Sequence, residues 1–502
     1  MTTATAAQLS ESARAFVEGG PHKLLIGEEW VESASGETFE TIDPATGEVI
    51  CAVAKAGTED VDRAVEAAQA ALEGAWGEMP AAGRERLMQK LADLIDANAQ
   101  ELAELEALDN GKPVTFAGAV DVAGSSAHLR YYAGWPTKIE GETIPVSWPN
   151  AFVYTLREPV GVCGQIIPWN FPLLMAAWKI APALAAGCTV ILKPAEQTPL
   201  SAVRLGQLIQ EAGFPPGVVN VLTGFGDTGA AMVDHPGIAK IAFTGSTAVG
   251  REIGAKAGRM LKRVTLELGG KSPNIILPDA DLKAAIKGSF TGIYFNTGQA
   301  CNAGSRLFVH SDQYDEVVSA LAEAAKGARV GPGLDKSTQF GPVVSKEQYD
   351  RVNSYIESGL SEGAEAVVGG NGEGDGDGNG NGGGYFINPT LFTNVTDDMK
   401  IAREEIFGPV LVAMPYDDLE EVARRANDTE YGLAAGVWTR DVANAHRMAK
   451  LLKAGNVYVN MYAPADPAAP FGGYKASGIG REMGHANLDA YLELKTVWTS
   501  LT

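Results

Sequence analysis

The sequence predicts an α/β protein built on two doubly wound parallel sheets, and two observations support this prediction. Between residues 161 and 268, helical stretches alternate with five β-rich runs, GVCGQII, TVILK, GVVNVL, KIAFTG and VTLEL. A second series begins with NIIL at 274–277 and continues through RLFVH, VLVAM, GVWT and NVYVN. Strands separated by about one helix length favour parallel sheets with crossover helices.

The elements before and within these series follow from local pattern. Residues 58–110 carry apolar side chains at a helical period, and Gly111 with Pro113 supplies a stop, so this stretch is predicted to be helical. Residues 369–384, GGNGEGDGDGNGNGGG, have no apolar side chain to bury and are predicted to form a surface insertion. The D-x-D-x-N-G opening at Asp375 resembles a calcium loop, but Phe386 stands where that loop needs a glutamate, so we expect no metal site.

Length, charge and composition narrow the class of function. A chain of 502 residues with 45% hydrophobic residues has room for two or three packed domains. The net charge of −22, without a basic block, argues against nucleic acid or an anionic membrane as partner. The N-terminal stretch lacks the features of a secretory signal, and the apolar run at 180–192 is too short to span a bilayer. We therefore expect a cytoplasmic protein that acts on a small molecule.

The cysteines indicate thiol chemistry. Cys51, Cys163, Cys188 and Cys301 are scattered without metal-ligand or redox spacing, which predicts four free thiols. Cys301 lies in NTGQACNAGSR, where small and polar neighbours leave room for a substrate to approach. Taken alone, a free cysteine is usually a small buried hydrophobe, but a thiolate in such a loop is a strong nucleophile for a carbonyl carbon.

A doubly wound sheet binds ligands beyond the carboxyl ends of its strands. The residues at those ends are therefore candidate site residues: Pro168, Trp169, Asn170, Lys193, Glu196, Gly245, Ser246, Glu267 and Leu268. Gly245 and Ser246 occupy a strand-to-helix turn, where backbone N–H groups and the helix dipole favour a pyrophosphate. From the residues alone, two plainer interpretations stay open. Asn170 is then an ordinary turn residue, and Glu267 is a carboxylate that caps a strand end or forms a salt bridge there.

Seven blocks, in order, resemble the NAD(P)-dependent aldehyde dehydrogenase superfamily, and the resemblance extends from about Lys23 to Trp498. The blocks are PWNFP (168–172), LKPAEQTP (192–199), FTGSTAVG (243–250), LELGGKSPN (266–274), FNTGQACNAGSR (295–306), EEIFGPV (404–410) and PFGGYKASGIGRE (470–482). The resemblance implies oxidation of an aldehyde to a carboxylic acid through a cysteine thiohemiacetal and a thioester that water hydrolyses.

The resemblance also assigns catalytic roles. Cys301 is the nucleophile, and the Asn170 side chain with the Cys301 backbone N–H stabilises the oxyanion, a contribution commonly worth about 10²–10³ in rate. Glu267 is the general base for thioester hydrolysis, and burial among leucines is expected to raise the pKa of this carboxyl group. Glu482 passes the proton from Glu267 onward. The alternative is that Glu482 only forms an ion pair with its neighbour Arg481.

The same resemblance implies NAD as cofactor. Lys193 and Glu196 hold the adenosine ribose, and the Glu196 carboxylate repels the 2′-phosphate of NADP, so NADP is disfavoured. Glu405 and Phe407 hold the nicotinamide ribose and back the ring, and Ile166, Pro168, Trp169 and Leu268 complete the site. The entry channel is predicted to be lined by Phe171, Met175, Trp178, Phe295 and Tyr462. Trp178 stands where members acting on semialdehyde acids carry arginine, which favours a neutral aliphatic or aromatic aldehyde.

The family's organisation implies three parts. Residues 1–137 and 159–266 form a Rossmann-like NAD-binding domain, residues 267–476 form the catalytic domain, and residues 138–158 with 487–502 form a β oligomerisation element. An isolated hairpin cannot bury the apolar residues of that element, so a homodimer or homotetramer is expected.

Two other classes of function remain open from the sequence. One is a cysteine hydrolase, in which one of the six histidines acts as base for Cys301, although none has a local signature linking it to that residue. The other is a binding protein that keeps the fold without activity. The joint presence of Cys301, Glu267 and Asn170 counts against the latter.

Overall fold

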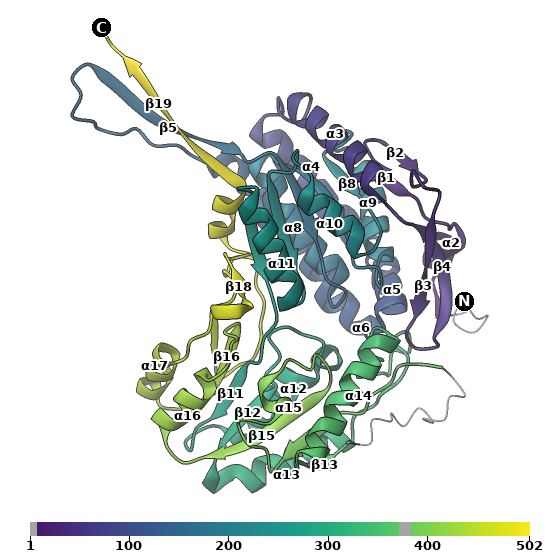
Figure 1. The fold of residues 1–502 in the computed structure, drawn as a ribbon, viewed down its shortest axis with the longest axis vertical. Coiled ribbons are helices and arrows are strands. Elements are labelled where there is room, and N and C mark those ends of the chain that lie inside the picture. Colours follow the sequence, from purple (N-terminus) through teal and green to yellow (C-terminus); the bar gives the residue numbers. More distant parts are fainter. Residues whose placement is uncertain (1–7, 371–382) are drawn as a thin grey trace.

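Two large sheets, each covered by helices on both faces, make up most of the computed structural model, which describes residues 8–370 and 383–502 (Figure 1). The stretch at Asp375 that resembles the opening of a calcium loop falls outside the described residues. The predicted doubly wound α/β fold is confirmed, since both series of β-rich runs form parallel strands.

The first sheet has eight strands, and its central five are parallel. In spatial order they are β18 (Gly478–Ile479), β10 (Arg263–Glu267), β9 (Lys240–Thr244), β6 (Val162–Ile166), β7 (Thr189–Lys193), β8 (Val219–Val221), β1 (Leu24–Ile26) and β2 (Glu29–Val31). The run β10-β9-β6-β7-β8 is parallel throughout, whereas β1, β2 and β18 join antiparallel at the edges. The strand order reverses around β6, which is where such sheets hold ligands.

Helices cover both faces of this sheet and form two separate cores. One face packs against α8 (Pro172–Ala186) and α9 (Leu200–Ala212), backed by α4 (Ala81–Ala97) and α7 (Ala123–Ala133). The other packs against α3 (Thr58–Glu73), α10 (Gly226–Asp234) and α11 (Thr247–Arg259). The stretch predicted to be helical at 58–110 forms α3, α4 and α5 (Ala99–Asn110), and Gly111 ends α5 with a left-handed φ of 89°.

The second sheet has seven strands. Their spatial order is β13 (Glu365–Val368), β14 (Thr390–Thr393), β15 (Val410–Tyr416), β12 (Arg306–His310), β11 (Pro273–Ile276), β16 (Ala434–Trp438) and β17 (Asn456–Val459). Only β13 pairs antiparallel. Its helices are α12 (Leu282–Tyr294), α13 (Tyr314–Lys326), α14 (Lys346–Ser361), α15 (Lys400–Arg403), α16 (Leu419–Asn427) and α17 (Val442–Leu451).

Shorter elements connect these layers. They are α2 (Glu11–Glu18), β3 (Thr38–Asp43), β4 (Glu48–Ala54), α6 (Val114–Phe116), the π-helix η1 (Ala117–Val122), and the 3₁₀ turns η2 (Pro136–Lys138), η3 (Phe295–Gly298), η4 (Ser311–Gln313), η5 (Lys475–Ser477) and η6 (His485–Tyr491). The chain leaves the first sheet at Glu267, the last residue of β10, and enters the second at Pro273. Glu267 therefore lies at the junction of the two sheets.

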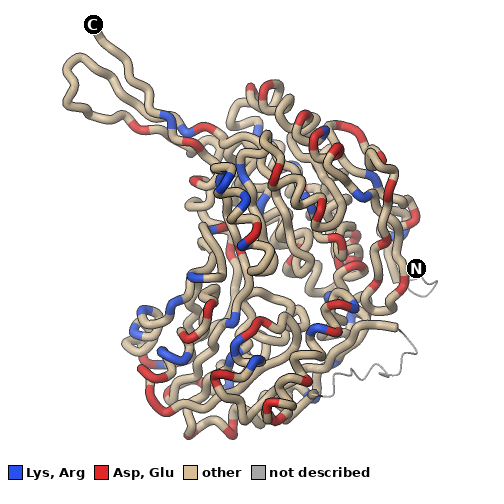
Figure 2. The backbone as a smooth tube through the Cα atoms, viewed as in Figure 1, with Lys and Arg blue, Asp and Glu red and all other residues tan. Residues whose placement is uncertain are grey.

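A two-stranded ribbon projects from the first sheet (Figure 1) and consists of β5 (Ala151–Pro159) and β19 (Leu492–Ser500). Residues 143–156 and 496–502 carry no charged side chain, and the outer part of the ribbon is uniformly tan in Figure 2. Elsewhere in that view acidic and basic residues are interspersed. Within residues 8–370 and 383–502, no helix combines the length and apolarity needed to cross a membrane.

Candidate active site

A cavity of about 320 Å³ is lined by residues from both large sheets. It brings together most of the predicted site residues: Pro168, Trp169, Asn170, Phe171, Met175, Trp178, Gly245, Ser246, Glu267, Leu268, Phe295, Cys301, Glu405, Phe407 and Glu482. These residues come from segments more than 300 positions apart in the chain, as Pro168 and Glu482 show. The cavity is therefore a product of the fold.

Cys301 lies on the cavity wall, in the loop between η3 and β12. Asn296, Thr297 and Gly298 all have left-handed φ values, of 51°, 56° and 73°, and turn the chain sharply from α12 into this loop. Gly270 packs against the loop from behind, where an added Cβ would lie 2.3 Å from the Cys301 carbonyl oxygen. Backbone conformations of this kind are costly and are found mainly at functional sites.

The thiol of Cys301 is not activated by a cation in the free protein. Its pKa is raised to about 12, mainly by burial and then by the carboxylates of Glu405 and Glu267, while the backbone N–H groups of Asn302 and Cys301 oppose this shift. The neighbouring carboxylates thus disfavour ionisation of this thiol. A base or a bound cationic ligand is needed to form the thiolate.

Asn170 follows β6 and directs its side chain at the cysteine loop. Its Nδ2 donates to the Gln299 carbonyl oxygen at 3.0 Å, and its own carbonyl oxygen accepts from Asn296 Nδ2 at 3.0 Å. An amide nitrogen carries two hydrogens, so one is left for a ligand oxygen. Asn170 is therefore bound to the loop of Cys301 and is not a free turn residue.

Glu267 and Glu482 are both buried beside the cavity, with exposures of 4% and 2%. Neither carboxylate oxygen of Glu267 has a hydrogen-bond partner among the described residues. Burial, followed by the charge of Glu482, raises the pKa of Glu267 well above its usual range, and Lys179 and Arg481 oppose the shift. An unpaired carboxyl group of this kind is suited to accept a proton from water.

Lys179, a fully buried residue of α8, forms the ion pair with Glu482. The alternative pairing with Arg481 is not seen, because Arg481 Nη1 donates to the carbonyl oxygens of Gly473 and Gly480 instead. Lys179 was not predicted, and no local motif marks it.

Glu405 and Phe407 flank the cavity from the second sheet. Glu405 Oε1 accepts from the Gly270 N–H at 2.9 Å, and burial raises its pKa to about 7, with the Gly270 N–H, Arg351 and Lys271 opposing. Phe407 has a left-handed φ of 61°, and its ring lies edge-to-face with Trp169 at 5.2 Å between centroids. A carboxylate and an aromatic ring are thus presented side by side.

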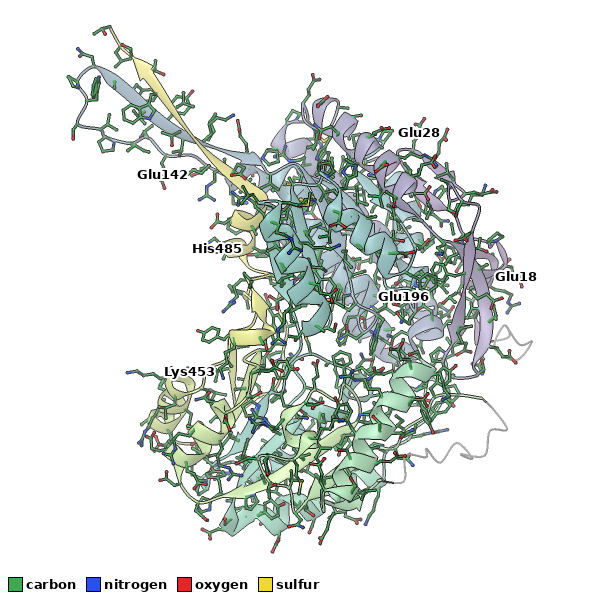
Figure 3. The ribbon with its side chains drawn as sticks, in the orientation of Figure 1. Glu18, Glu28, Glu142, Glu196, Lys453 and His485 are labelled. Carbon is green, nitrogen blue, oxygen red and sulfur yellow. The ribbon has the colours of Figure 1, made fainter. Side chains whose placement is uncertain are left out.

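Three predicted cofactor residues lie outside the cavity wall. Lys193 is the last residue of β7 and Glu196 follows three positions later, with Nζ and Oε2 3.6 Å apart. Burial lowers the pKa of Lys193. Ile166 ends β6 and is buried in the core beneath α3 and α10. In Figure 3, Glu196 lies in the part of the molecule built on the eight-stranded sheet. It is far from Lys453, which lies between α17 and β17 of the other part. At the neighbouring strand end, Ser246 caps α11 by accepting from the Val249 N–H.

The prediction that Tyr462 lines the channel needs correction, because its ring packs behind the cysteine loop. Its hydroxyl donates to the Asn302 carbonyl oxygen at 3.0 Å, and its ring fills the space left by Gly292, Gly304 and Gly436. Tyr458 lines the cavity instead. The two tyrosines are four residues apart, and the chain turns between them at Asn460, whose φ is 55°.

Several lining residues were not predicted from the sequence. They are Val120, Leu174, Thr244, Ala300, Asn302, Glu347, Gln348, Arg351, Tyr458 and Phe471. Gln348 and Arg351, from the first turns of α14, donate to the backbone oxygens of Phe407 and Glu405 at 2.8 and 2.9 Å. Their helix is amphipathic in an ordinary way, so nothing local distinguishes them.

Comparison with known proteins agrees with this geometry. Residues 30–497 match the aldehyde dehydrogenase family. The chain is 56% identical over 496 residues to the putative aldehyde dehydrogenase DhaS of Bacillus subtilis, covering 98% of each, and 52% identical over 479 residues to human retinal dehydrogenase 2, covering 95% and 91%. The NAD+ complex of an aldehyde dehydrogenase from Bacillus cereus superposes with a TM-score of 0.95 at 54% identity, covering 98% and 99%. Since the match spans both sheets and the cavity between them, the chain belongs to the aldehyde dehydrogenase family.

Proposed function

We propose that the protein oxidises an aldehyde to the carboxylic acid and reduces NAD+ to NADH, with Cys301 as the nucleophile. The observation that carries this proposal is the meeting of a thiol, an amide donor and an unpaired buried carboxyl group in one cavity, namely Cys301, Asn170 and Glu267. Each supplies one requirement of the reaction: attack, oxyanion stabilisation and activation of water.

The residues present fit NAD. Gly245 and Ser246 open α11 toward the cavity, so that backbone N–H groups and the helix dipole meet a pyrophosphate. Glu405 and Phe407 would hold the nicotinamide ribose and back the ring, and Lys193 with Glu196 would hold the adenosine ribose. The cofactor would accept the hydride, which no side chain of the protein is able to accept. The NAD+ complex of the Bacillus cereus relative supports this reading.

The protein's own groups account for the remaining steps. Cys301 Sγ, after losing its proton, bonds to the aldehyde carbon, and the oxygen receives hydrogen bonds from Asn170 Nδ2 and the Cys301 N–H. Departure of hydride leaves a thioester on Cys301. Glu267 takes a proton from water as the water oxygen bonds to the thioester carbon, and the C–S bond then breaks to release the acid. Glu482, paired with Lys179, receives the proton from Glu267.

A cysteine hydrolase is less well supported. None of the six histidines lines the cavity that contains Cys301, so no imidazole is in place to act as base. The test is to mix the purified protein with NAD+ and benzaldehyde and to follow the near-ultraviolet absorbance of NADH. Stoichiometric appearance of NADH and benzoate supports the proposal, and hydrolysis of esters without any NADH formation from aldehydes would contradict it.

We propose a neutral aliphatic or aromatic aldehyde as substrate. The wall on the substrate side is apolar and aromatic, with Phe171, Met175, Trp178, Phe295 and Phe471. The one lysine or arginine among the lining residues, Arg351, lies beside Glu405 in the cofactor half. Trp178 is held by stacking on His128 and by an edge-to-face contact with Phe471.

This lining leads to a prediction about selectivity. A carboxylate-bearing aldehyde would be desolvated in the cavity without a cationic partner, which costs free energy. We expect benzaldehyde to exceed succinic semialdehyde in kcat/KM by roughly a hundredfold or more, a difference of about 2.7 kcal/mol. Trp178→Arg, which adds a cation to the wall, is expected to narrow this ratio, with Trp135→Arg as a control outside the cavity. Equal kcat/KM values for the two aldehydes in the wild type would contradict the proposed substrate class.

Glu196 is expected to govern the choice of coenzyme. Its carboxylate repels the 2′-phosphate of NADP, so Glu196→Gln is expected to weaken NAD modestly and to raise the NADP-to-NAD ratio of kcat/KM by roughly tenfold. Glu252→Gln, on the exposed face of α11, removes the same charge without facing the strand ends and serves as control. An unchanged coenzyme ratio in Glu196→Gln would show that this carboxylate does not contact the ribose.

We also propose self-association through the β5–β19 ribbon, as a homodimer or homotetramer. Large apolar side chains are exposed on it, including Leu494 at 64% and Trp498 at 60%, and Trp148, in the loop just before β5, is 73% exposed. A two-stranded ribbon is marginally stable alone, and exposed apolar surface of this extent favours an interface.

A further inference from the structure

Lys112 is a buried lysine near the active site that has no role in the mechanism above. It follows Gly111 at the end of α5 and is 3% exposed. Its Nζ lies 2.8 Å from Asp121 Oδ1, 3.2 Å from Glu106 Oε1 and 2.9 Å from the Asn170 carbonyl oxygen. An ammonium group has three donors, and these three oxygens use all of them.

The two carboxylates anchor Lys112 to three segments of the chain. Glu106 belongs to α5, and its second oxygen accepts from the Leu173 N–H at 3.1 Å at the start of α8. Asp121 belongs to the π-helix η1 and is fully buried, and burial together with Glu106 raises its pKa well above the usual range, with Lys112 opposing. Lys112 therefore lies at the centre of a cluster that joins α5, η1 and the segment entering α8.

That segment is where the backbone needs partners. Residues 167–171 lie between β6 and α8 and have no regular secondary structure, so their carbonyl groups need partners outside the segment. The Phe171 carbonyl oxygen accepts from the Met175 N–H of α8 at 2.8 Å, and those of Trp169 and Asn170 accept from side chains. Asn110 Nδ2 donates to the Trp169 carbonyl oxygen at 2.7 Å, while Lys112 and Asn296 both donate to that of Asn170. The peptide carrying the Asn170 side chain is thus fixed from the side of α5 and from the cysteine loop.

We propose that Lys112 is a positioning residue for the oxyanion step, acting through the Asn170 carbonyl to hold the Asn170 amide beside Cys301. The inference rests on the proposed function, in which that amide stabilises the charge formed on the aldehyde oxygen. Lys112 does not line the cavity, so it has no direct contact with substrate. Oxyanion donors work because they are held in place before the reaction, and a displacement of about 1 Å costs roughly a hundredfold in rate.

The test compares Lys112→Met in two backgrounds. In the wild type, we expect the variant to lower the single-turnover rate of NADH formation by roughly tenfold to a hundredfold. NAD+ affinity is expected to stay close to wild type. In the Asn170→Ala background the same change is expected to have little further effect on the rate, because that background has no Asn170 amide left to position. Alkylation of Cys301 by iodoacetamide, which forms no oxyanion, is expected to keep its wild-type rate.

Arg204→Met is the matched control. Arg204 of α9 is a cation paired with Glu101 of α5, at 2.8 Å between Nε and Oε1, and it does not line the cavity. It is expected to lower the melting temperature without changing the single-turnover rate. If Lys112→Met does not fold, Lys112→Met/Asp121→Asn replaces it, because removing one cation and one anion together keeps the formal charge of the cluster.

The outcomes separate the two proposals. Absence of NADH formation by the wild type contradicts the proposed function itself. The positioning role is overturned if the wild type is active but Lys112→Met lowers the single-turnover rate by the same factor in the Asn170→Ala background as in the wild type. It is also overturned if the folded Lys112→Met variant keeps the wild-type single-turnover rate. A parallel fall in the alkylation rate also overturns it, since the variant would then disturb the cysteine loop as a whole.

Discussion

Replacing Cys301 by alanine is expected to abolish aldehyde oxidation, with kcat falling by about 10⁴-fold or more because no other group forms the covalent intermediate. NAD+ binding is expected to persist, since the thiol contributes little to holding a dinucleotide. Quenching of protein fluorescence measures this binding directly, because Trp169 lies on the cavity wall against Phe407. Loss of activity with retained quenching is the expected pair of results.

Cys51→Ala is the matched control for this variant. Cys51 is also a partly exposed free thiol whose pKa burial raises to about 12, but it lies on β4, away from the cavity. Its replacement is expected to leave turnover unchanged. Normal turnover by Cys301→Ala would contradict the covalent mechanism, whatever the behaviour of Cys51→Ala.

Replacing Glu267 by glutamine is expected to separate the two halves of the reaction. Glutamine keeps the shape of the side chain but accepts no proton, so hydride transfer proceeds while hydrolysis of the thioester stalls. Rapid mixing with NAD+ and aldehyde is expected to give a burst of at most about one NADH per active site, followed by a steady rate lower by about 10²–10⁴. Glu104→Gln is the control for effects on stability alone, because Glu104 is a buried carboxylate of α5 that accepts hydrogen bonds from Ser10.

The pH dependence of thioester hydrolysis gives a second test of the role of Glu267. Because the pKa of Glu267 is raised, its carboxylate form becomes populated only as pH rises through that pKa, so wild-type hydrolysis of the thioester is expected to accelerate with pH. The variant should lose this rise. If Glu267 also deprotonates Cys301, whose pKa is about 12, the burst of the variant slows and then recovers as rising pH forms thiolate. If Glu267→Gln turns over at the wild-type steady rate at neutral pH, the role of Glu267 as base is refuted.

The sequence was sufficient to predict the fold and the candidate nucleophile because both depend on local pattern. The β-rich runs and the helical stretches between them predicted which strands lie in each parallel sheet, and the ends of those strands contain Asn170 and Glu267. Cys301 was recognisable from its small neighbours and from a motif within a few residues of it. Each of these signals is contained in a short window of the chain, where backbone propensity and side-chain period act directly.

Other features depended on packing between distant segments. Tyr458, not Tyr462, lines the cavity, because a left-handed turn at Asn460 reverses the chain between them. Glu482 pairs with Lys179, which is 303 positions away, instead of with its neighbour Arg481. No local pattern distinguishes these partners, since a buried charge takes whichever opposite charge the fold brings near it.

The sequence by itself therefore determined the two α/β sheets, the family and the residues able to do the chemistry. Only the tertiary structure decided how those residues are held and charged. The pKa values of Cys301 and Glu267 follow from burial in a cavity between two sheets, and the Asn170 carbonyl oxygen accepts hydrogen bonds from Lys112 and Asn296, which are far apart in the chain. Desolvation and hydrogen bonding between distant segments exist only once the chain has folded, and for that reason no reading of short motifs predicts them.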